Sequence, residues 1–322
     1  MAGVYVIMAV AMRVQIFSTL LVLLAPVVCA QTAPANQPPQ QQQQQQPEFV
    51  RQGQQLMRDG KLEEALALYR QNLQTSPDSL PAMNAAGVVL DLMGQGAEAR
   101  KYFAKAIELA PAPDRKAAAQ RAMAMSWAFE GDCKKTLEYQ QEVLDYYVSV
   151  KDFFQQGEIA DEGARVCLDA GDWKTALKWY QMGHDAGLQQ PDIKPDRQDL
   201  WAFRWEHAQG RIAARRDRKE EAQKHVVAAK AILDKGTNPT QAPFLPYLAG
   251  YVALYTGDAK TALDELQKAN QNDPFIQCLI AEAYEKLNEK DKAMEFYRKA
   301  STTTAHNPAG AYARRVTRKK LS

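Results

Sequence analysis

The chain has 322 residues, with 40 basic and 38 acidic side chains and a hydrophobic content of 46%. A charge balance this close to neutral gives no bulk reason to bind nucleic acid, which requires a basic face. No nucleic-acid partner is therefore expected. The length allows either two ordinary domains or one elongated repeat array.

Residues 1–30 are predicted to be a signal peptide. Their apolar run, 16–28, has the length of a signal core and is too short to span a membrane. Arg13 precedes it, and small residues suit cleavage after Ala30. We expect an exported protein, periplasmic or secreted, with no membrane span after cleavage. Lipid anchoring through Cys29 is a less favoured alternative. Alternative starts are Met1, Met8 and Met12.

Residues 31–47 are rich in Gln, Pro and Ala and include an unbroken glutamine run from Gln40 to Gln46. Such a composition cannot bury enough surface to offset chain entropy. We expect a disordered linker. Self-association through the glutamine run is the weaker alternative.

From residue 48 onward a pattern of small and apolar residues recurs. The first copy consists of Phe49, Gly53, Leu56, Gly60, Leu62, Ala65, Tyr69 and Pro77. After a shift of 34 residues it returns as Met83, Gly87, Leu90, Gly94, Gly96, Ala99, Phe103 and Pro111. A period of this length indicates stacked helical hairpins, each of which buries its apolar face only against its neighbours.

The second helix of each hairpin is the clearest part of the pattern. A turn residue that tolerates a left-handed backbone comes first, then a small residue that permits close helix approach, then a larger residue that fills the space beside it. The seven turn residues are Gly60, Gly94, Gly131, Gly171, Asp217, Gly257 and Asn288. The small residues follow at Ala65, Ala99, Thr136, Ala176, Ala222, Ala262 and Ala293.

These residues resemble the tetratricopeptide repeat family, as found in exported bacterial members. The resemblance implies an all-α, right-handed superhelical solenoid of about seven antiparallel helix pairs over residues 48–305. Loops are expected near 187–199 and 236–243, where proline and glycine interrupt the pattern. Residues 306–322 carry five basic side chains, and we expect a solvated capping tail there, because a terminal repeat needs a polar outer face.

No catalytic or metal-binding pattern accompanies the repeats. The four histidines (His184, His207, His225 and His306) lack ligand spacing, and neither a nucleophile elbow nor a phosphate loop occurs. We expect no enzyme, no cofactor and no metal. The predicted function is an exported scaffold that binds a protein or peptide in its concave groove. A structural role in envelope or membrane-complex assembly, including self-association, is the alternative, and an enzyme subunit is a weaker one.

In the family's fold, residues at set distances from the small residue of each first helix face the groove. Around Gly250 this rule selects Tyr247, Tyr251, Leu254 and Tyr255, with Phe244 one turn earlier. Around Gly210 it selects His207, Arg211 and Arg215, with Arg204 before them. An aromatic wall beside a basic one suits a peptide with acidic and apolar residues. The alternative is that the tyrosines pack between repeats. Around Ala164 the rule gives Asp161, Arg165 and Asp169, a mixed set without clear preference.

Three cysteines remain after the predicted cleavage, which permits one disulfide in an oxidising compartment. Cys133 opens the second helix of the third hairpin, and Cys167 lies late in the next helix. Neighbouring antiparallel helices bring these two ends together, so a bridge between Cys133 and Cys167 is the candidate pairing. Cys278 would then be a free thiol.

Overall fold

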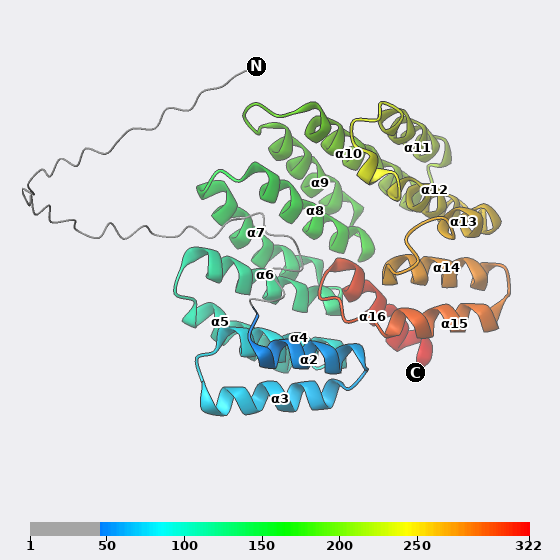
Figure 1. Ribbon diagram of the computed structural model, residues 1–322. Coiled ribbons are helices and arrows are strands. Elements are labelled where there is room, and N and C mark those ends of the chain that lie inside the picture. The colour runs from blue at the N-terminus through cyan, green and yellow to red at the C-terminus, as the bar shows by residue number, and fades with distance from the viewer. Residues whose placement is uncertain (1–45) are drawn as a thin grey trace, which may run out of the picture. The chain divides into compact units, whose positions relative to one another are not determined.

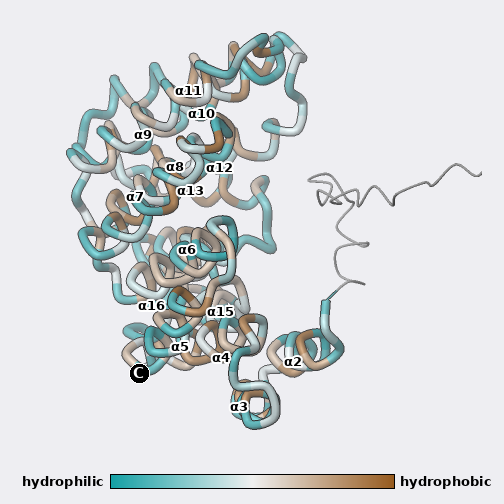
Figure 2. The backbone as a smooth tube through the Cα atoms, turned by 90° about the vertical axis from the view of Figure 1, so that its left-hand side faces the viewer, coloured by the Kyte–Doolittle hydropathy of each residue, from teal (hydrophilic) through white to brown (hydrophobic). Residues whose placement is uncertain are grey.

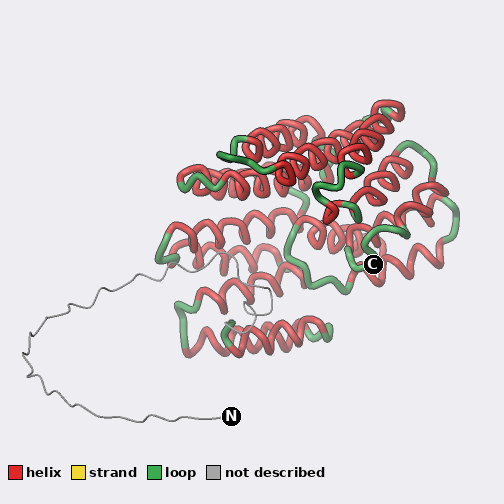
Figure 3. Tube along the Cα trace, turned by 45° about the horizontal axis from the view of Figure 1, so that its top comes forward, coloured by secondary structure: helices red, strands yellow, loops and turns green. Residues whose placement is uncertain are grey.

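The computed structural model describes residues 46–322, in which α-helices follow one another and are joined by short connections (Figures 1 and 3). The predicted signal peptide and almost all of the predicted linker lie outside the described residues. Within them, seven antiparallel helix pairs follow one another and one further helix ends the chain, which confirms the expected all-α, repeat-like solenoid. No helix among the described residues has both the length and the apolar character needed to cross a membrane.

The first four pairs are α2 (Glu48–Arg58) with α3 (Leu62–Thr75), α4 (Leu80–Met93) with α5 (Gly96–Leu109), α6 (Pro113–Glu130) with α7 (Cys133–Ser149), and α8 (Phe153–Asp169) with α9 (Trp173–Leu188). The next three are α10 (Pro195–Arg215) with α11 (Lys219–Leu233), α12 (Phe244–Tyr255) with α13 (Ala259–Leu266), and α14 (Pro274–Lys286) with α15 (Lys290–Ser301). The last helix is α16 (Pro308–Leu321).

The turn inside each pair has the backbone that the sequence pattern predicts. All seven turn residues have positive φ, including the non-glycine residues Asp217 at 55° and Asn288 at 61°. Gly, Asp and Asn adopt this left-handed conformation at the lowest steric cost. Local chemistry therefore determines where each hairpin turns.

Close contact between the two helices of a pair depends on the small residues. A Cβ atom on Gly53 would lie 2.1 Å from the Tyr69 hydroxyl, and one on Gly87 would lie 2.6 Å from the Phe103 ring. Both rings are fully buried. Each aromatic side chain thus fills the space that the glycine of its partner helix leaves open. Figure 2 shows hydrophobic and hydrophilic stretches following one another along the labelled helices, such as α2 and α5.

The first expected loop, near residues 187–199, is shorter than predicted, whereas the second lies between α11 and α12 and covers residues 234–243. Helix α9 extends to Leu188 and α10 begins at Pro195, so Asp199 lies inside a helix. In the second loop, Pro239–Gln241 forms a 3-10 turn, η1, before α12 begins. Pro195 and Pro239 each begin a helical segment, a position where the missing N–H costs nothing.

The C-terminal segment differs most from its prediction. It forms α16, which packs against α6 and α8 on one side and α14 and α15 on the other (Figure 1). The first half of α16 is buried on all sides through small residues and one aromatic side chain, namely Ala309, Gly310, Ala311, Tyr312 and Ala313. The expectation of a solvated tail was therefore wrong for this half, because other helices pack against α16 on both sides.

Two basic side chains of α16 find partners at helix ends. Arg318 Nη2 donates to the carbonyl of Asp91 in the last turn of α4, at 2.9 Å, and Arg315 Nη2 donates to the carbonyl of Asp169 at the end of α8, at 3.3 Å. The last carbonyls of a helix lack internal donors and carry partial negative charge. Arg315 and Arg318, whose charges predicted a solvated tail, thus bind the carboxyl ends of α8 and α4.

Candidate functional site

The candidate site is a pocket of about 380 Å³ that is lined by residues of α8, α10 and α12. Its remaining walls come from Tyr180 of α9, from Asp273 just before α14, and from the start of α16 at Asn307, Pro308 and Ala309. A volume of this size is within the range of small-ligand sites, about 300–1,000 Å³. Because α16 supplies one wall, the pocket exists only in the closed superhelix.

Five of the nine groove candidates line this pocket: Arg204, His207, Arg211, Phe244 and Tyr247. Phe244 is 46% exposed and forms part of the rim, whereas Tyr247, His207 and Arg211 are nearly covered. The rule based on repeat position therefore brought together residues of α10 and α12 that do share one cavity.

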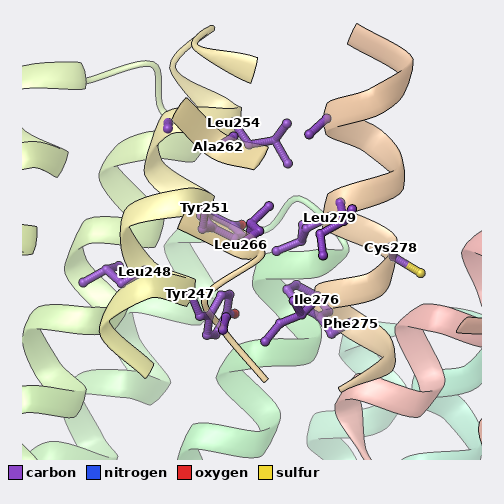
Figure 4. Packing of buried hydrophobic residues seen from close by; sticks show 14 of the residues in the cluster. Tyr247, Leu248, Tyr251, Leu254, Ala262, Leu266, Phe275, Ile276, Cys278 and Leu279 are labelled. Atoms are coloured by element: carbon purple, nitrogen blue, oxygen red, sulfur yellow. The ribbon is translucent and has the colours of Figure 1, made fainter. Parts of the chain in front are cut away.

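The other four candidates lie away from the pocket. Tyr251 and Leu254 are fully buried in the core between α12, α13 and α14, close to Leu266 and Leu279 (Figure 4). Tyr255 donates its hydroxyl hydrogen to Glu282 of α14, and the Arg215 guanidinium stacks 4.7 Å from the Tyr255 ring. These tyrosines belong to the packing between repeats, the alternative that the sequence left open, because neighbouring helices cover α12 on both sides.

Arg211 joins three elements at the base of the pocket. Its Nη2 donates to the Tyr180 hydroxyl at 2.8 Å, its Nη1 to the Tyr247 hydroxyl at 3.3 Å, and its Nε to the backbone carbonyl of His207 at 3.3 Å. A buried guanidinium with these partners is held rigidly. Arg211 is therefore a structural cation rather than a freely accessible one.

His207 lies against the Tyr247 ring, with 4.8 Å between ring centroids. Burial holds the pKa of His207 well below its ordinary value, and the nearby positive charge of Arg211 lowers it further. The imidazole is thus neutral near pH 7. Its Nε2 atom is buried without a hydrogen-bond partner among the described residues.

One wall of the pocket is a line of charged residues on α8. The groove rule had selected two of them, Asp161 and Arg165, but their mixed charges indicated no particular ligand. Glu158 binds Arg204, and Glu162 accepts from Arg121 Nε at 2.9 Å. Asp161 approaches Arg204 only to 4.0 Å. Burial raises the pKa of Asp161 to about 7, against the opposing attraction of Arg204 and with the help of Glu158.

Arg165 lies one turn further along α8. Its guanidinium stacks 4.5 Å from the Phe275 ring, and its Nε and Nη2 atoms are buried without a hydrogen-bond partner in the described part of the chain. The sequence offered Arg165 through the same spacing rule as Asp161. The sequence could not single out Arg165 among the charged residues of α8, because only the structure shows which of them form ion pairs.

The two cysteines that the sequence analysis paired, Cys133 and Cys167, lie 2.07 Å apart at sulfur, with 4.8 Å between their Cα atoms. This disulfide links the start of α7 to the last turn of α8, beside the pocket wall. Cys278 is a buried free thiol in α14. Among residues 46–322 no group of three or more His, Cys, Asp or Glu side chains is arranged to hold a metal ion.

Two segments of the chain, residues 80–113 and 276–305, match the tetratricopeptide repeat family model. These segments are tetratricopeptide repeats. They coincide with α4–α5 and with α14–α15. No curated protein matches the chain.

Solved structures with tetratricopeptide repeats are similar to this chain. Putative kinesin light chain repeats from Podosopora anserina are 15% identical, with a TM-score of 0.48, and the match covers 58% of this chain and 94% of that one. A tetratricopeptide repeat protein from Parabacteroides merdae is 12% identical, with a TM-score of 0.48, and the match covers 79% of this chain and 91% of that one. At these values neither similarity bears on the partner of this chain.

Proposed function

We propose that the protein is a scaffold that binds a protein or peptide partner through the concave side of its repeat array. The observation that carries the proposal is the convergence of Arg204, His207 and Tyr247 with the exposed ring of Phe244 at one pocket. Aromatic residues and arginines dominate the energetics of protein recognition. A partner segment with apolar and acidic residues suits this combination.

Phe244 provides the sharpest test. Affinity capture with the purified chain would identify a partner, whose binding would then be measured directly by calorimetry. Phe244→Ala is expected to weaken that binding at least about tenfold, because it removes an exposed aromatic contact. Val227→Ala is the matched control, since Val227 is 61% exposed on α11 and is not among the residues of this pocket.

Equal loss of binding in both variants, or no loss in Phe244→Ala, would contradict the proposed face. Thermal unfolding of both variants should remain close to that of the wild type, because neither side chain is part of the core. The binding measurement therefore reports the surface and not the fold.

We further propose that the protein is exported to the periplasm or secreted. The apolar run before Ala30 and the disulfide between Cys133 and Cys167 support this proposal, because disulfides persist in oxidising compartments. Mass spectrometry of the N-terminus of the protein from cells would test it. A mature chain that begins near Gln31 is expected, and an intact Met1, Met8 or Met12 in the cytosol would overturn it.

A further inference from the structure

The pocket contains donors for which the protein supplies no acceptor. Arg165 presents Nε and Nη2 as buried N–H donors without hydrogen-bond partners among residues 46–322. His207 Nε2 is buried without a partner as well, and in the neutral ring it donates or accepts according to the tautomer. His207 is only 7% exposed, so bulk water has little access to it. Leaving a buried polar group unpaired costs about 1–3 kcal/mol. The two Arg165 nitrogens therefore require an acceptor from outside the protein.

The same pocket contains a carboxylate that lacks a donor. Asp161 makes no hydrogen bond among the described residues, and its closest cation, Arg204, is 4.0 Å away and already bound to Glu158. The Asp161 side chain remains 26% exposed, so a ligand can reach it. Asp161 precedes Arg165 by one helical turn, which places the two groups on one face of α8, about 6 Å apart along the axis.

The other charges of the pocket are already paired. Arg204 neutralises Glu158, and Arg121 neutralises Glu162. Asp273 accepts the backbone N–H of Phe275 at 2.8 Å as the N-cap of α14. Arg211 donates to two tyrosine hydroxyls and a carbonyl. Among the charged side chains that line the pocket, Arg165 and Asp161 are thus the two that make no hydrogen bond within residues 46–322. Asp273 and Asp169 attract Arg165 without bonding to it.

Aromatic side chains form much of the remaining lining, which includes Phe203, Phe244, Tyr180 and Tyr247. They offer apolar contact area to a side chain that enters beside the charged pair. With about 380 Å³, the cavity holds a small molecule rather than a folded segment.

We propose that this pocket binds a small zwitterion, an amino acid or a short peptide, with its carboxylate on Arg165 and its ammonium group on Asp161. The site does not require a protein partner and goes beyond the proposed scaffold function. A free amino acid and a dipeptide share this chemistry, and they differ in the separation of their two charges. The aromatic lining favours apolar side chains.

Isothermal titration calorimetry of the full purified chain tests the proposal with L-leucine, with leucyl-leucine and with the other free amino acids. Saturable binding of at least one of these probes is expected. Binding of leucine alone identifies a free amino acid, and binding of leucyl-leucine alone identifies a short peptide. Leucinamide and N-acetylleucine, which each lack one charge, should bind at least about tenfold more weakly, because each leaves one buried charge unpaired.

Substitutions inside and outside the pocket show whether binding depends on the pocket residues themselves. Arg165→Met and Asp161→Asn are each expected to weaken binding at least about tenfold. Arg216→Met is the matched control, because the Arg216 guanidinium stacks 4.2 Å from the Trp173 ring, as Arg165 stacks on Phe275, but is not part of this pocket. Arg216→Met should bind as the wild type does.

Asp161→Asn keeps the test decisive even if Arg165→Met fails to fold. This variant removes a desolvated charge, so it should raise the midpoint of thermal unfolding at pH 8 while it weakens binding, a combination that loss of structure does not produce. The proposal is overturned if no probe binds saturably at concentrations up to about 10 mM. It is equally overturned if Asp161→Asn binds as tightly as the wild type.

Discussion

His306 Nε2 lies 2.8 Å from Asp91 Oδ2, and this contact joins residues 215 positions apart in the sequence. The second oxygen of Asp91 accepts a hydrogen bond from the Ser126 hydroxyl at 2.8 Å, and the His306 ring stacks on Phe129 with 5.2 Å between centroids. Asp91 is almost completely buried. The segment before α16 is thus anchored to α4 and α6, which closes the superhelix on itself.

His306→Ala is expected to lower the free energy of unfolding by about 1–3 kcal/mol, because it leaves a buried Asp91 oxygen without its partner. Asp91→Asn serves as a second variant, and the double variant should cost less than the sum of the two single changes. Urea unfolding curves measure all three. Strict additivity would mean that the two side chains do not interact in solution.

Tyr251 and Phe244 lie on the same helix and should respond in opposite ways to truncation. Tyr251→Ala is expected to destabilise the protein by about 3–5 kcal/mol, because the ring is fully buried. Phe244→Ala should change stability by only about 0.5 kcal/mol, since the ring is 46% exposed. Thermal unfolding compares the two. A small effect of Tyr251→Ala would contradict its place in the core.

Trp201 packs directly over two glycines of neighbouring helices. A Cβ atom on Gly157 or on Gly187 would lie 2.1 Å from the indole ring. Gly→Ala inside a helix ordinarily stabilises it by about 1 kcal/mol. Gly157→Ala is expected instead to destabilise the protein by about 1–3 kcal/mol, because overpacking displaces the ring.

The combination of Gly157→Ala with Trp201→Leu provides the control. The smaller side chain removes the steric conflict, so the added methyl group should then be neutral or stabilising relative to Trp201→Leu alone. An equal penalty in both backgrounds would assign the effect to the backbone of α8 and not to the tryptophan.

The disulfide between Cys133 and Cys167 closes a loop over a sequence separation of 34 residues. A loop of this length is expected to contribute about 4 kcal/mol, mainly by restricting the unfolded chain. Unfolding curves with and without dithiothreitol should differ by this amount, and the Cys133→Ser/Cys167→Ser double variant should not respond to the reductant. Native peptide mapping that finds both thiols alkylated would refute the bridge.

Asp161 should make stability depend on pH. Its folded-state pKa is raised to about 7 by burial, while Arg204 and Arg211 oppose the shift and Glu158 and Glu162 assist it. A raised carboxyl pKa favours the folded state below the ordinary pKa of about 4, and this contribution is lost as the pH rises through 7. Asp161→Asn should therefore raise the thermal midpoint more at pH 8 than at pH 5, because the loss builds up between pH 4 and pH 7.

An unchanged difference between Asp161→Asn and the wild type at pH 5 and pH 8 would show that the carboxyl group is not desolvated. Glu220→Gln is a suitable control because Glu220 is an exposed carboxylate on α11. Its effect should be small at both pH values.

The repeat architecture was predictable because its determinants are local. The turn at Asp217 needs only a residue that tolerates positive φ, and the pairing of Gly87 with Phe103 needs only two residues of complementary size on adjacent helices. The groove rule found Arg204, His207 and Phe244 for the same reason, since helical spacing alone sets the side of the helix on which each residue lies.

The residues that the sequence could not place depend on curvature. Arg315 binds the end of α8 only because the superhelix turns far enough for α16 to reach α6 and α8. Tyr251 is buried because α13 and α14 pack against α12. Arg165 is a site candidate because the other charged side chains of this wall form ion pairs, and those pairs depend on the tertiary structure. The sequence alone thus determined each helix pair and its turn, through backbone conformation and side-chain size. Tertiary structure decided which charges remain unpaired and which faces are covered, because small rotations between successive repeats add up to contacts between residues more than 200 positions apart.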